Sequence, residues 1–328
     1  MSELALSAYA AETGSHVLER PRTARFAAFL RGFDEARERG RLAALGLRYL
    51  ARSSSGFPPL LRAIHDPPPG LFVRGGADVA LLIRPAVAVV GARACSAYGR
   101  HVARQVGREL AAAGLVVVSG LARGVDGEAH RGALEAGGLT VAVLGCGIDR
   151  DYPAAHGELA TRIVAAGGLI VSEYAPGVEP APWRFPARNR IVAGLCAASV
   201  VVEARERSGA LITADFALEE GREVFVVPGE ITSALSAGSN ALLRLGAAPL
   251  LAAEDVLQSF GLEAATPAAV DLSAGAAVAL ACIREGSCGA DELVRRTGLD
   301  TASVAIALSE LELAGLVSPD EGVYRAAG

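Results

Sequence analysis

The sequence contains no lysine, and all 31 of its basic residues are arginine. A Walker A P-loop places a lysine on the nucleotide phosphates, and protein kinases need a lysine carried on a strand, so both classes are excluded. Enzymes that form a Schiff base through a lysine amine are excluded for the same reason. Any anion-binding site in this chain must therefore use arginine side chains, backbone N–H groups and hydroxyls.

Cysteine is scarce, and its five copies stand apart from one another with no C-x-x-C pair. This spacing argues against a disulfide scaffold and against a cysteine-rich zinc site, and it fits a reduced compartment. The histidines are scattered as well, and none has a partner at metal-ligand spacing. We therefore expect a cytoplasmic protein with no metal site.

Long apolar runs are also missing. The longest unbroken one extends from Ala276 to Ile283, whereas a membrane-spanning helix needs roughly 20 apolar residues. The segment from Met1 to Ala11 carries Glu3 and no early basic residue before an apolar run, which is unlike a signal peptide. The sequence therefore predicts no association with a membrane.

The chain has 328 residues, of which 52% are apolar and 20% charged, enough for one large or two modest domains. Its formal charge of −5 is unevenly distributed. Residues 261–328 carry 4 arginines and 10 acidic residues. By contrast, the segment from Arg84 to Arg131 has 7 arginines and 3 acidic residues, and the segment from Arg184 to Arg190 has 3 arginines and no acidic residue. The overall acidity thus conceals two local basic clusters.

From residue 85 onward, short apolar runs alternate with amphipathic helical runs. Such βα alternation with continuous apolar strands predicts an α/β fold: an extended, Rossmann-like, doubly wound and mostly parallel sheet. The predicted strands are 86–90, 115–119, 140–144, 168–172, 199–203, 223–227 and 249–251. The predicted helices are 97–112, 125–136, 154–166, 186–197, 210–220, 238–245 and 253–260.

The remaining segments suggest four parts. Residues 1–50 show helical periodicity and form an N-terminal helical segment, followed by the Rossmann-like domain at 51–260, in which 53–70 is an extended lead-in. An Ala/Thr/Pro-rich linker covers 261–272. Residues 273–328 indicate three helices and a hairpin, with a helix-turn-helix spacing around Thr297–Asp300, as in a small winged helix.

Glycine and arginine gather in the loops that follow the predicted strands. Because ligands bind outside the carboxyl ends of strands in open α/β sheets, near helix N-termini, these loops predict one anion-binding edge. A plainer interpretation stays open, in which the glycines serve tight turns and the arginines pair with nearby acids. The spacing of Gly91 and Gly99 does not give G-x-G-x-x-G after the first strand, so a bound NAD or FAD is disfavoured, and we expect no cofactor.

Six ordered motifs in these loops resemble the DNA-processing protein A family (DprA, also called Smf). They are VGAR at 90–93, SGLARGVDGEAH at 119–130, GCGIDRDYP at 145–153, FPARNRIVAG at 185–194, VEARERSGALITA at 202–214 and VFVVPGEITSALSAGSN at 224–240. The likeness covers about residues 57–251 in order, and 273–328 more weakly.

The resemblance implies a non-catalytic mediator of recombination. Members of the family bind single-stranded DNA that enters the cell during natural transformation, protect it, load the RecA recombinase onto it, and commonly form dimers. By position, the DNA-binding role passes to Gly91, Arg93, Ser96, Gly120, Arg123, Gly124, Arg188, Asn189, Arg190, Ser208 and Gly209. Phe185 offers a surface on which a base could stack, or it belongs to the core.

Two arginines of this set cannot act alike on a regular helix. Arg188 and Arg190 are two positions apart, so their side chains diverge by about 200°. We expect Arg188 on DNA and Arg190 shared between DNA and an acid such as Glu173 or Glu203. The second helix of the helix-turn-helix, Thr301 to Leu313, carries Glu310 and Glu312 and no arginine, so the winged helix is not expected to bind phosphates.

Two other functions compete with this one. A nucleotide phosphoribohydrolase of the same broad fold could act on a phosphorylated small ligand at the Gly/Arg edge. Such enzymes show a P-G-G-x-G-T-x-x-E loop, and the nearest segment here, Ser208 to Thr213, has no glutamate in place. A winged-helix transcription factor is the other alternative, and the acidic second helix argues against it.

Overall fold

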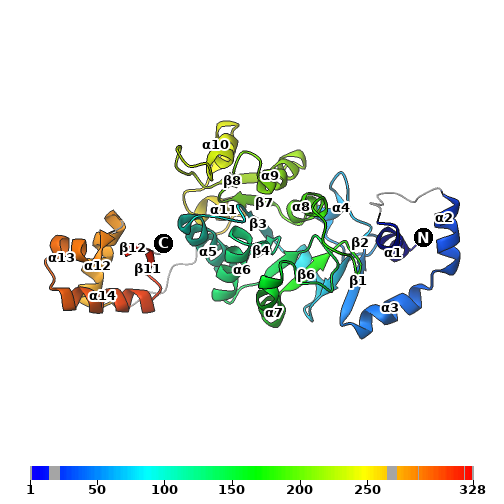
Figure 1. Ribbon diagram of the computed structural model, residues 1–328, viewed down its shortest axis with the longest axis horizontal. Helices are drawn as coiled ribbons and strands as arrows, with labels where there is room; N and C mark the ends of the chain where they lie inside the picture. The colour runs from blue at the N-terminus through cyan, green and yellow to red at the C-terminus, as the bar shows by residue number, and fades with distance from the viewer. Residues whose placement is uncertain (1, 15–22, 264–271, 287, 321, 327–328) are drawn as a thin grey trace. The chain divides into compact units, whose positions relative to one another are not determined.

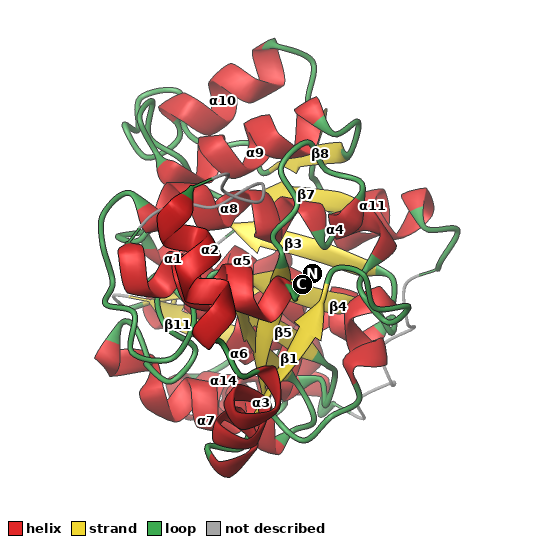
Figure 2. Ribbon diagram, turned by 90° about the vertical axis from the view of Figure 1, so that its right-hand side faces the viewer, coloured by secondary structure: helices red, strands yellow, loops and turns green. Residues whose placement is uncertain are grey.

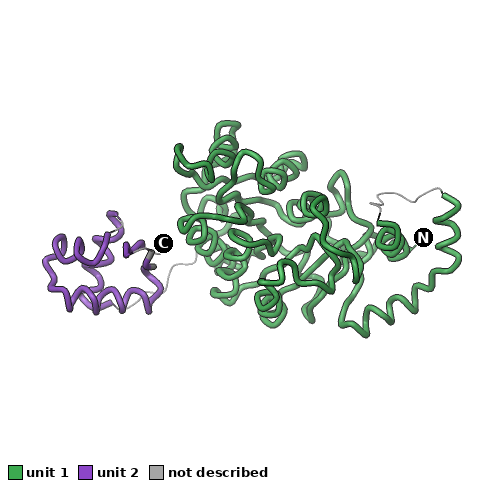
Figure 3. Tube along the Cα trace, in the orientation of Figure 1, with its two compact units in different colours: residues 1–265 green, residues 266–328 purple. Residues whose placement is uncertain are grey.

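The computed structural model describes residues 2–14, 23–263, 272–286, 288–320 and 322–326. The chain divides into two compact units, Met1–Ala265 and Thr266–Gly328, drawn in different colours in Figure 3. Each unit has a hydrophobic core of its own. Most of the predicted linker at 261–272 lies outside the described residues.

A nine-stranded sheet forms the centre of the first unit, in the order β1-β2-β6-β5-β4-β3-β7-β8-β9. The strands from β3 to β9 are parallel, while β1 and β2 extend the sheet beyond β6 in antiparallel pairs. This confirms the predicted mostly parallel, doubly wound sheet. The strand bounds are β1 (Leu47–Ala51), β2 (Gly70–Arg74), β3 (Ala86–Val90), β4 (Val116–Ser119), β5 (Thr140–Val143), β6 (Leu169–Ser172), β7 (Ala198–Val201), β8 (Glu223–Val226) and β9 (Ala248–Pro249).

The apolar strands are buried on both faces of the sheet. In β3, Ala88 and Val90 belong to one core cluster, while Val87 and Val89 belong to another on the opposite face. Successive side chains of a strand point to opposite faces, so a continuous apolar run fits a sheet covered on both sides. Figure 2 shows the yellow strands lying among the covering helices.

Two sets of helices supply this cover. Core contacts place one set on the face of Val87 and Val89: α5 (Ala97–Ala112), α6 (Val125–Glu135), α7 (Gly157–Ala165) and α11 (Ala253–Ser259). The opposite face packs against α4 (Pro59–Arg62), α8 (Arg184–Gly194), α9 (Gly209–Glu219) and α10 (Ala237–Arg244). Short 3₁₀ segments cover η1 (Val79–Ile83) and η2 (Ala154–His156). The strand order reverses at β3, which lies between β4 and β7.

The N-terminal segment forms the three helices α1 (Glu3–Thr13), α2 (Ala24–Gly32) and α3 (Glu35–Ala44), shown in blue in Figure 1. Strand β1 then crosses the predicted boundary at residue 50, and the extended lead-in expected at 53–70 contains α4 and the start of β2. The Glu3 carboxylate accepts hydrogen bonds from Ser53 N (3.1 Å) and Ser53 Oγ (2.7 Å). This contact attaches α1 to the loop after β1.

The second unit has three helices and a small sheet, as predicted: α12 (Ala274–Glu285), α13 (Ala290–Thr297) and α14 (Thr301–Leu313), with β10 (Cys288–Gly289), β11 (Val317–Asp320) and β12 (Val323–Ala326) in the order β10-β12-β11. Gly298 ends α13 with a φ of 72°, a left-handed conformation that suits glycine at a helix C-terminus. Leu280, Leu293 and Leu311 belong to the hydrophobic core of this second unit. Across the described ranges, no helix is both long and apolar enough to cross a membrane.

Candidate nucleic-acid interface

A cavity of about 430 Å³ opens where β3, β4 and β7 end, at the edge that the sequence predicts. We call it the strand-end cavity. Six of the predicted site residues line it: Gly91, Arg93, Arg188, Asn189, Ser208 and Gly209. They come from the loop after β3, from α8 and from the start of α9. The fold therefore brings together residues that lie more than a hundred positions apart in the sequence.

Aromatic rings form one wall of the strand-end cavity. Phe185 stacks on Tyr152 with ring centroids 5.1 Å apart and planes 28° apart. The Arg93 guanidinium carbon lies 5.2 Å from the Phe185 ring centroid, within cation–π distance. Tyr152 remains 41% exposed. The wall can thus offer a flat apolar surface beside a positive charge.

The N-terminus of α9 also lines the cavity, through Ser208, Gly209 and Ala210. Ser208 caps this helix and accepts a hydrogen bond from Ala210 N (3.3 Å). Asn189 Nδ2 donates to the Gly209 carbonyl (2.9 Å) and so attaches α8 to the first turn of α9. Free N–H groups and the helix dipole make such a terminus favourable for an anion. The N-terminus of α9 therefore provides an anion-favouring site that needs no lysine.

Arg188 lies at the base of the cavity and is buried. Its Nη1 donates to the Gly120 carbonyl (2.8 Å) and to the Val143 carbonyl. Burial lowers the pKa of Arg188, while nearby Asp126 partly offsets this effect. A methyl group at Gly120 would overlap the guanidinium, so glycine leaves room for Arg188 to lie against the loop. Arg188 thus fastens the loop after β4 and contributes positive charge to the cavity.

The loop after β4 is organised by buried polar groups. Asp126 Oδ2 accepts hydrogen bonds from Gly120 N (3.1 Å) and Ala122 N (3.3 Å), and burial raises the pKa of this carboxyl group. Leu121 has a φ of 57°, unusual for a residue other than glycine. Its carbonyl is bonded by His156 Nδ1 (2.9 Å). Asp126, at the start of α6, and the more distant His156 therefore fix the loop conformation.

Three predicted residues of this loop, Gly120, Arg123 and Gly124, lie outside the cavity lining. Gly124 has a φ of 74°, and a methyl group there would overlap the Ala92 carbonyl, so it serves the close approach of two loops. Arg123 is exposed on the surface beside it. The structure therefore does not bring Arg123 into the strand-end cavity.

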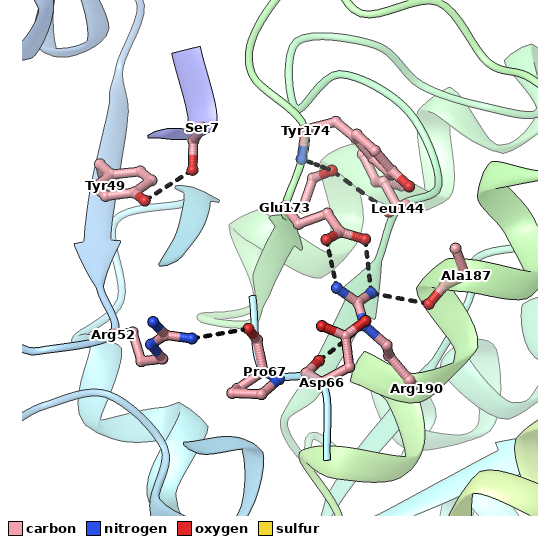
Figure 4. A network of polar contacts seen from close by, with 11 residues as sticks. Ser7, Tyr49, Arg52, Asp66, Pro67, Leu144, Glu173, Tyr174, Ala187 and Arg190 are labelled. Atoms are coloured by element: carbon pink, nitrogen blue, oxygen red, sulfur yellow. Dashed lines mark hydrogen bonds and ion pairs between the residues drawn. The ribbon is translucent and has the colours of Figure 1, made fainter. Parts of the chain in front are cut away.

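Arg190 is not among the residues that line the strand-end cavity. Figure 4 shows its guanidinium directed at Glu173 and Asp66. Its guanidinium forms a two-point ion pair with Glu173 at 2.8 and 2.7 Å, and a further ion pair with Asp66 at 2.9 Å. Although burial opposes its charge, the Glu173 carboxylate raises the pKa of Arg190. The predicted pairing with Glu173 is confirmed, and Arg190 holds α8 against β6 and the loop before β2.

Ser96 is also occupied within the protein. It caps α5 by accepting from Gly99 N (3.0 Å), and its N and Oγ both donate to the Glu203 carboxylate. From the sequence, Glu203 was expected only as a possible partner of Arg190. The only feature of the sequence that could have indicated this contact is the position of Glu203, an acidic residue shortly after the strand that became β7, while Ser96 precedes the helix that became α5.

Sequence reasoning missed Tyr152, although it lies inside one of the quoted motifs. Nothing in a lone tyrosine before a proline indicates that it will stack on Phe185, because the two residues belong to different loops. Among the described residues, no group of three or more His, Cys, Asp or Glu side chains could hold a metal ion. The groups that the strand-end cavity offers to a ligand are thus the rings of Phe185 and Tyr152, the guanidinium groups of Arg93 and Arg188, and backbone N–H groups.

The comparisons with known families cover both units. Residues 48–261 match the family model described as DNA recombination-mediator protein A, and residues 263–322 match the DprA winged helix domain. The DNA processing protein DprA of Streptococcus pneumoniae is 48% identical over 204 residues, which are 62% of this chain and 71% of the relative. Protein Smf of Escherichia coli K12 is 39% identical over 282 residues, 83% and 75% of the two chains.

Solved structures give the same assignment. This chain resembles DNA processing protein A from Streptococcus pneumoniae with a TM-score of 0.66 and 38% identity, covering 78% of this chain and 92% of that one. It also resembles DNA processing protein A from Helicobacter pylori, described for its mode of binding single-stranded DNA, with a TM-score of 0.58 and 31% identity. That match covers 65% of this chain and 95% of the other.

Proposed function

Because the chain belongs to the DNA recombination-mediator protein A family, we propose that it binds single-stranded DNA in the strand-end cavity. It acts by binding and not by turnover: it protects the strand and passes it to the RecA recombinase. The Helicobacter pylori relative, whose structure concerns single-stranded DNA binding, supports the choice of ligand.

One observation carries this proposal: the strand-end cavity joins an aromatic wall to an anion-binding helix terminus. Phe185 and Tyr152 offer a stacking surface that is indifferent to base identity. Arg93 and the N-terminus of α9 supply the charge for the backbone phosphates. A base in a duplex is stacked within its own helix and cannot reach this wall, so the cavity should favour a single strand over a duplex.

The direct test is a fluorescence anisotropy titration with labelled oligo-dT, with an unlabelled duplex of equal length as competitor. The wild-type chain should prefer the single strand, and Phe185→Ala should weaken binding by about 1–3 kcal/mol, as expected for one lost stacking contact. Leu218→Ala, which removes a half-exposed side chain on the outer part of α9, is the matched control. Equal affinity for duplex, or turnover of nucleotides in a parallel assay, would contradict the proposal.

The transfer to RecA has its own test. RecA filaments should assemble faster on oligo-dT covered by a single-strand-binding protein when the wild-type chain is present. Phe185→Ala should lose this acceleration in proportion to its loss of affinity, because the strand must be held before it can be passed on. Equal acceleration by both proteins would show that loading does not depend on the cavity.

A homodimer is part of the proposal, and the outer edge of β9 supports it. β9 ends the nine-stranded sheet, and Leu245 and Leu251 beside it are 83% and 80% exposed. Large exposed apolar side chains of this kind are typical of protein interfaces. Leu251→Glu should shift the mass measured by light scattering from dimer to monomer, while Leu45→Glu, at an equally apolar but distant position, should not. A dimer unaffected by Leu251→Glu would place the interface elsewhere.

A further inference from the structure

Trp183, the only tryptophan in the chain, follows the cavity-lining Pro182 and itself lines a second cavity with Tyr174 and Arg184. The Arg184 guanidinium carbon is 4.7 Å from a Trp183 ring centroid and 5.3 Å from the Tyr174 ring centroid. Trp183 is nevertheless 48% exposed. One face of the indole is therefore supported by a guanidinium, and a large part of its surface remains open to a ligand.

The position of Trp183 follows from the start of α8. Pro182 and Phe185 line the strand-end cavity, whereas Trp183 does not. Trp183 and Phe185 are two residues apart at the first turn of α8, so their side chains diverge by about 200°. The two rings thus lie on opposite sides of one helix N-terminus.

The N-terminus between the two rings is suited to a phosphate. No side chain caps α8, since its N-cap residue is Trp183 itself. The helix dipole therefore favours an anion at this point. A backbone that leaves the cavity toward Trp183 would carry a phosphate across this terminus.

Arg184 adds a charge that the protein leaves unbalanced. Its Nη1 donates to the Glu179 carbonyl, and the Nε atom is buried with no hydrogen-bond partner in the described structure. None of the ion pairs formed within the described ranges involves Arg184. Arg190, four positions before the end of the same helix, is by contrast matched by the Glu173 carboxylate. Arg184 instead presents its charge beside an exposed ring, a combination that suits a nucleotide.

We propose that Trp183 is a second base-stacking platform, on which single-stranded DNA lays a base after leaving the strand-end cavity across the N-terminus of α8. Arg184 supports the ring from beneath and attracts the adjacent phosphate. This inference rests on the proposed function, because it extends the path of the same strand. If Trp183 instead bound a protein partner, Trp183→Ala and the wild type would bind oligo-dT equally at every length in the test below.

The test is a length series of oligo-dT, from about 4 to about 16 nucleotides, titrated against the full chain. Trp183→Ala should match the wild type for the shortest strands and bind roughly ten-fold more weakly once the strand is long enough to reach the platform. Trp183→Phe, which keeps an aromatic face, should recover most of the loss. Leu45→Ala, which removes an exposed apolar side chain after α3, should change nothing at any length.

The emission of Trp183 gives a second readout, since no other tryptophan contributes to it. Long strands should quench this emission more strongly than the shortest ones, because stacking places a base against the indole. Curves for Trp183→Ala and wild type that coincide at every length, or differ equally at every length, would overturn the inference and leave the proposed function standing. A wild-type chain that binds no oligo-dT of any length would instead overturn the proposed function itself.

Discussion

The carboxylate of Glu203 sits at the N-terminus of α5, where it accepts hydrogen bonds from Ser96 N at 2.9 Å and Ser96 Oγ at 2.5 Å. A methyl group at Gly99 would overlap this carboxylate, so the helix start is shaped around it. Helix N-termini at the carboxyl edge of a sheet attract anions, and here the protein supplies the anion from its own chain. The DNA phosphates are therefore expected at α9 and not at α5.

Replacing Ser96 should test this division. Ser96→Ala removes the cap of α5 and one donor to Glu203, so the free energy of unfolding should fall by about 1–2 kcal/mol. The affinity for oligo-dT and its dependence on salt should stay unchanged, because Ser96 is occupied within the protein. Urea denaturation and anisotropy titrations measure the two effects. A weaker affinity for oligo-dT with intact stability would place Ser96 on DNA.

Arg190 should behave as a structural residue. Arg190→Ala leaves Glu173 buried without its partner, which costs about 3–5 kcal/mol of unfolding free energy. Replacing both residues by leucine removes both charges, and should restore part of that loss. In each variant that remains folded, the slope of log K against log salt should equal that of the wild type. A slope that falls while the melting temperature stays constant would show that Arg190 contacts phosphate.

The sequence predicted the parallel strands because β-branched apolar runs leave few alternatives for Val87 to Val90 or Val116 to Val118. It did not predict β1 and β2. Strand β1 follows directly after α3, and β2 follows a proline-rich stretch. Each has only five residues, so its pattern of apolar residues is too short to distinguish a strand from the neighbouring segment. Their pairing partners are settled by tertiary contacts, since β2 joins the sheet through β6, about a hundred residues away.

The candidate site was predictable to the extent that strand ends converge. Gly91, Arg93, Ser208 and Gly209 meet at one edge because parallel strands end on the same side. The orientation of Arg188 and Arg190 on α8 depends on which acids the fold places beneath the helix, and this is a packing outcome. Stacking between Tyr152 and Phe185 likewise depends on how two loops fold over each other.

Arg93 should contact phosphate directly. It is exposed, it lies against Phe185, and no ion pair neutralises it within the described structure. Arg93→Ala should weaken binding to oligo-dT by about 1.5–3 kcal/mol at low salt, as for a hydrogen bond to a charged group. The slope of log K against log salt should flatten by about 0.7 for the lost contact. The melting temperature should not change.

Arg37→Ala provides the matched control for Arg93, because it removes an exposed arginine from α3, far along the chain from the strand-end cavity. Arg37→Ala removes one positive charge, as Arg93→Ala does, but it removes no side chain from the cavity. Equal slopes of log K against log salt for the two variants would mean that Arg93 acts only through the overall charge of the protein.

His130 should make the stability of the fold depend on pH. It is fully buried: Nδ1 lies 2.7 Å from Thr140 Oγ1, and Nε2 has no partner in the described structure. Burial, with smaller contributions from the neighbouring His156 and Arg131, lowers its pKa to about 3. In the unfolded chain the pKa is near 6.5. Between these values the unfolded state binds more protons, so stability falls as the pH falls from about 6.5 toward 3.

The size of this effect follows from the two pKa values. Between pH 7 and pH 5, His130 should lower the unfolding free energy by about 2 kcal/mol. His130→Gln cannot be protonated and can still donate to Thr140, so its unfolding free energy should lack this part of the pH dependence. Urea denaturation of both proteins at the two pH values measures the difference directly. If the two proteins lose the same free energy on acidification, then His130 takes up a proton within the fold, and water or a rearrangement must reach Nε2.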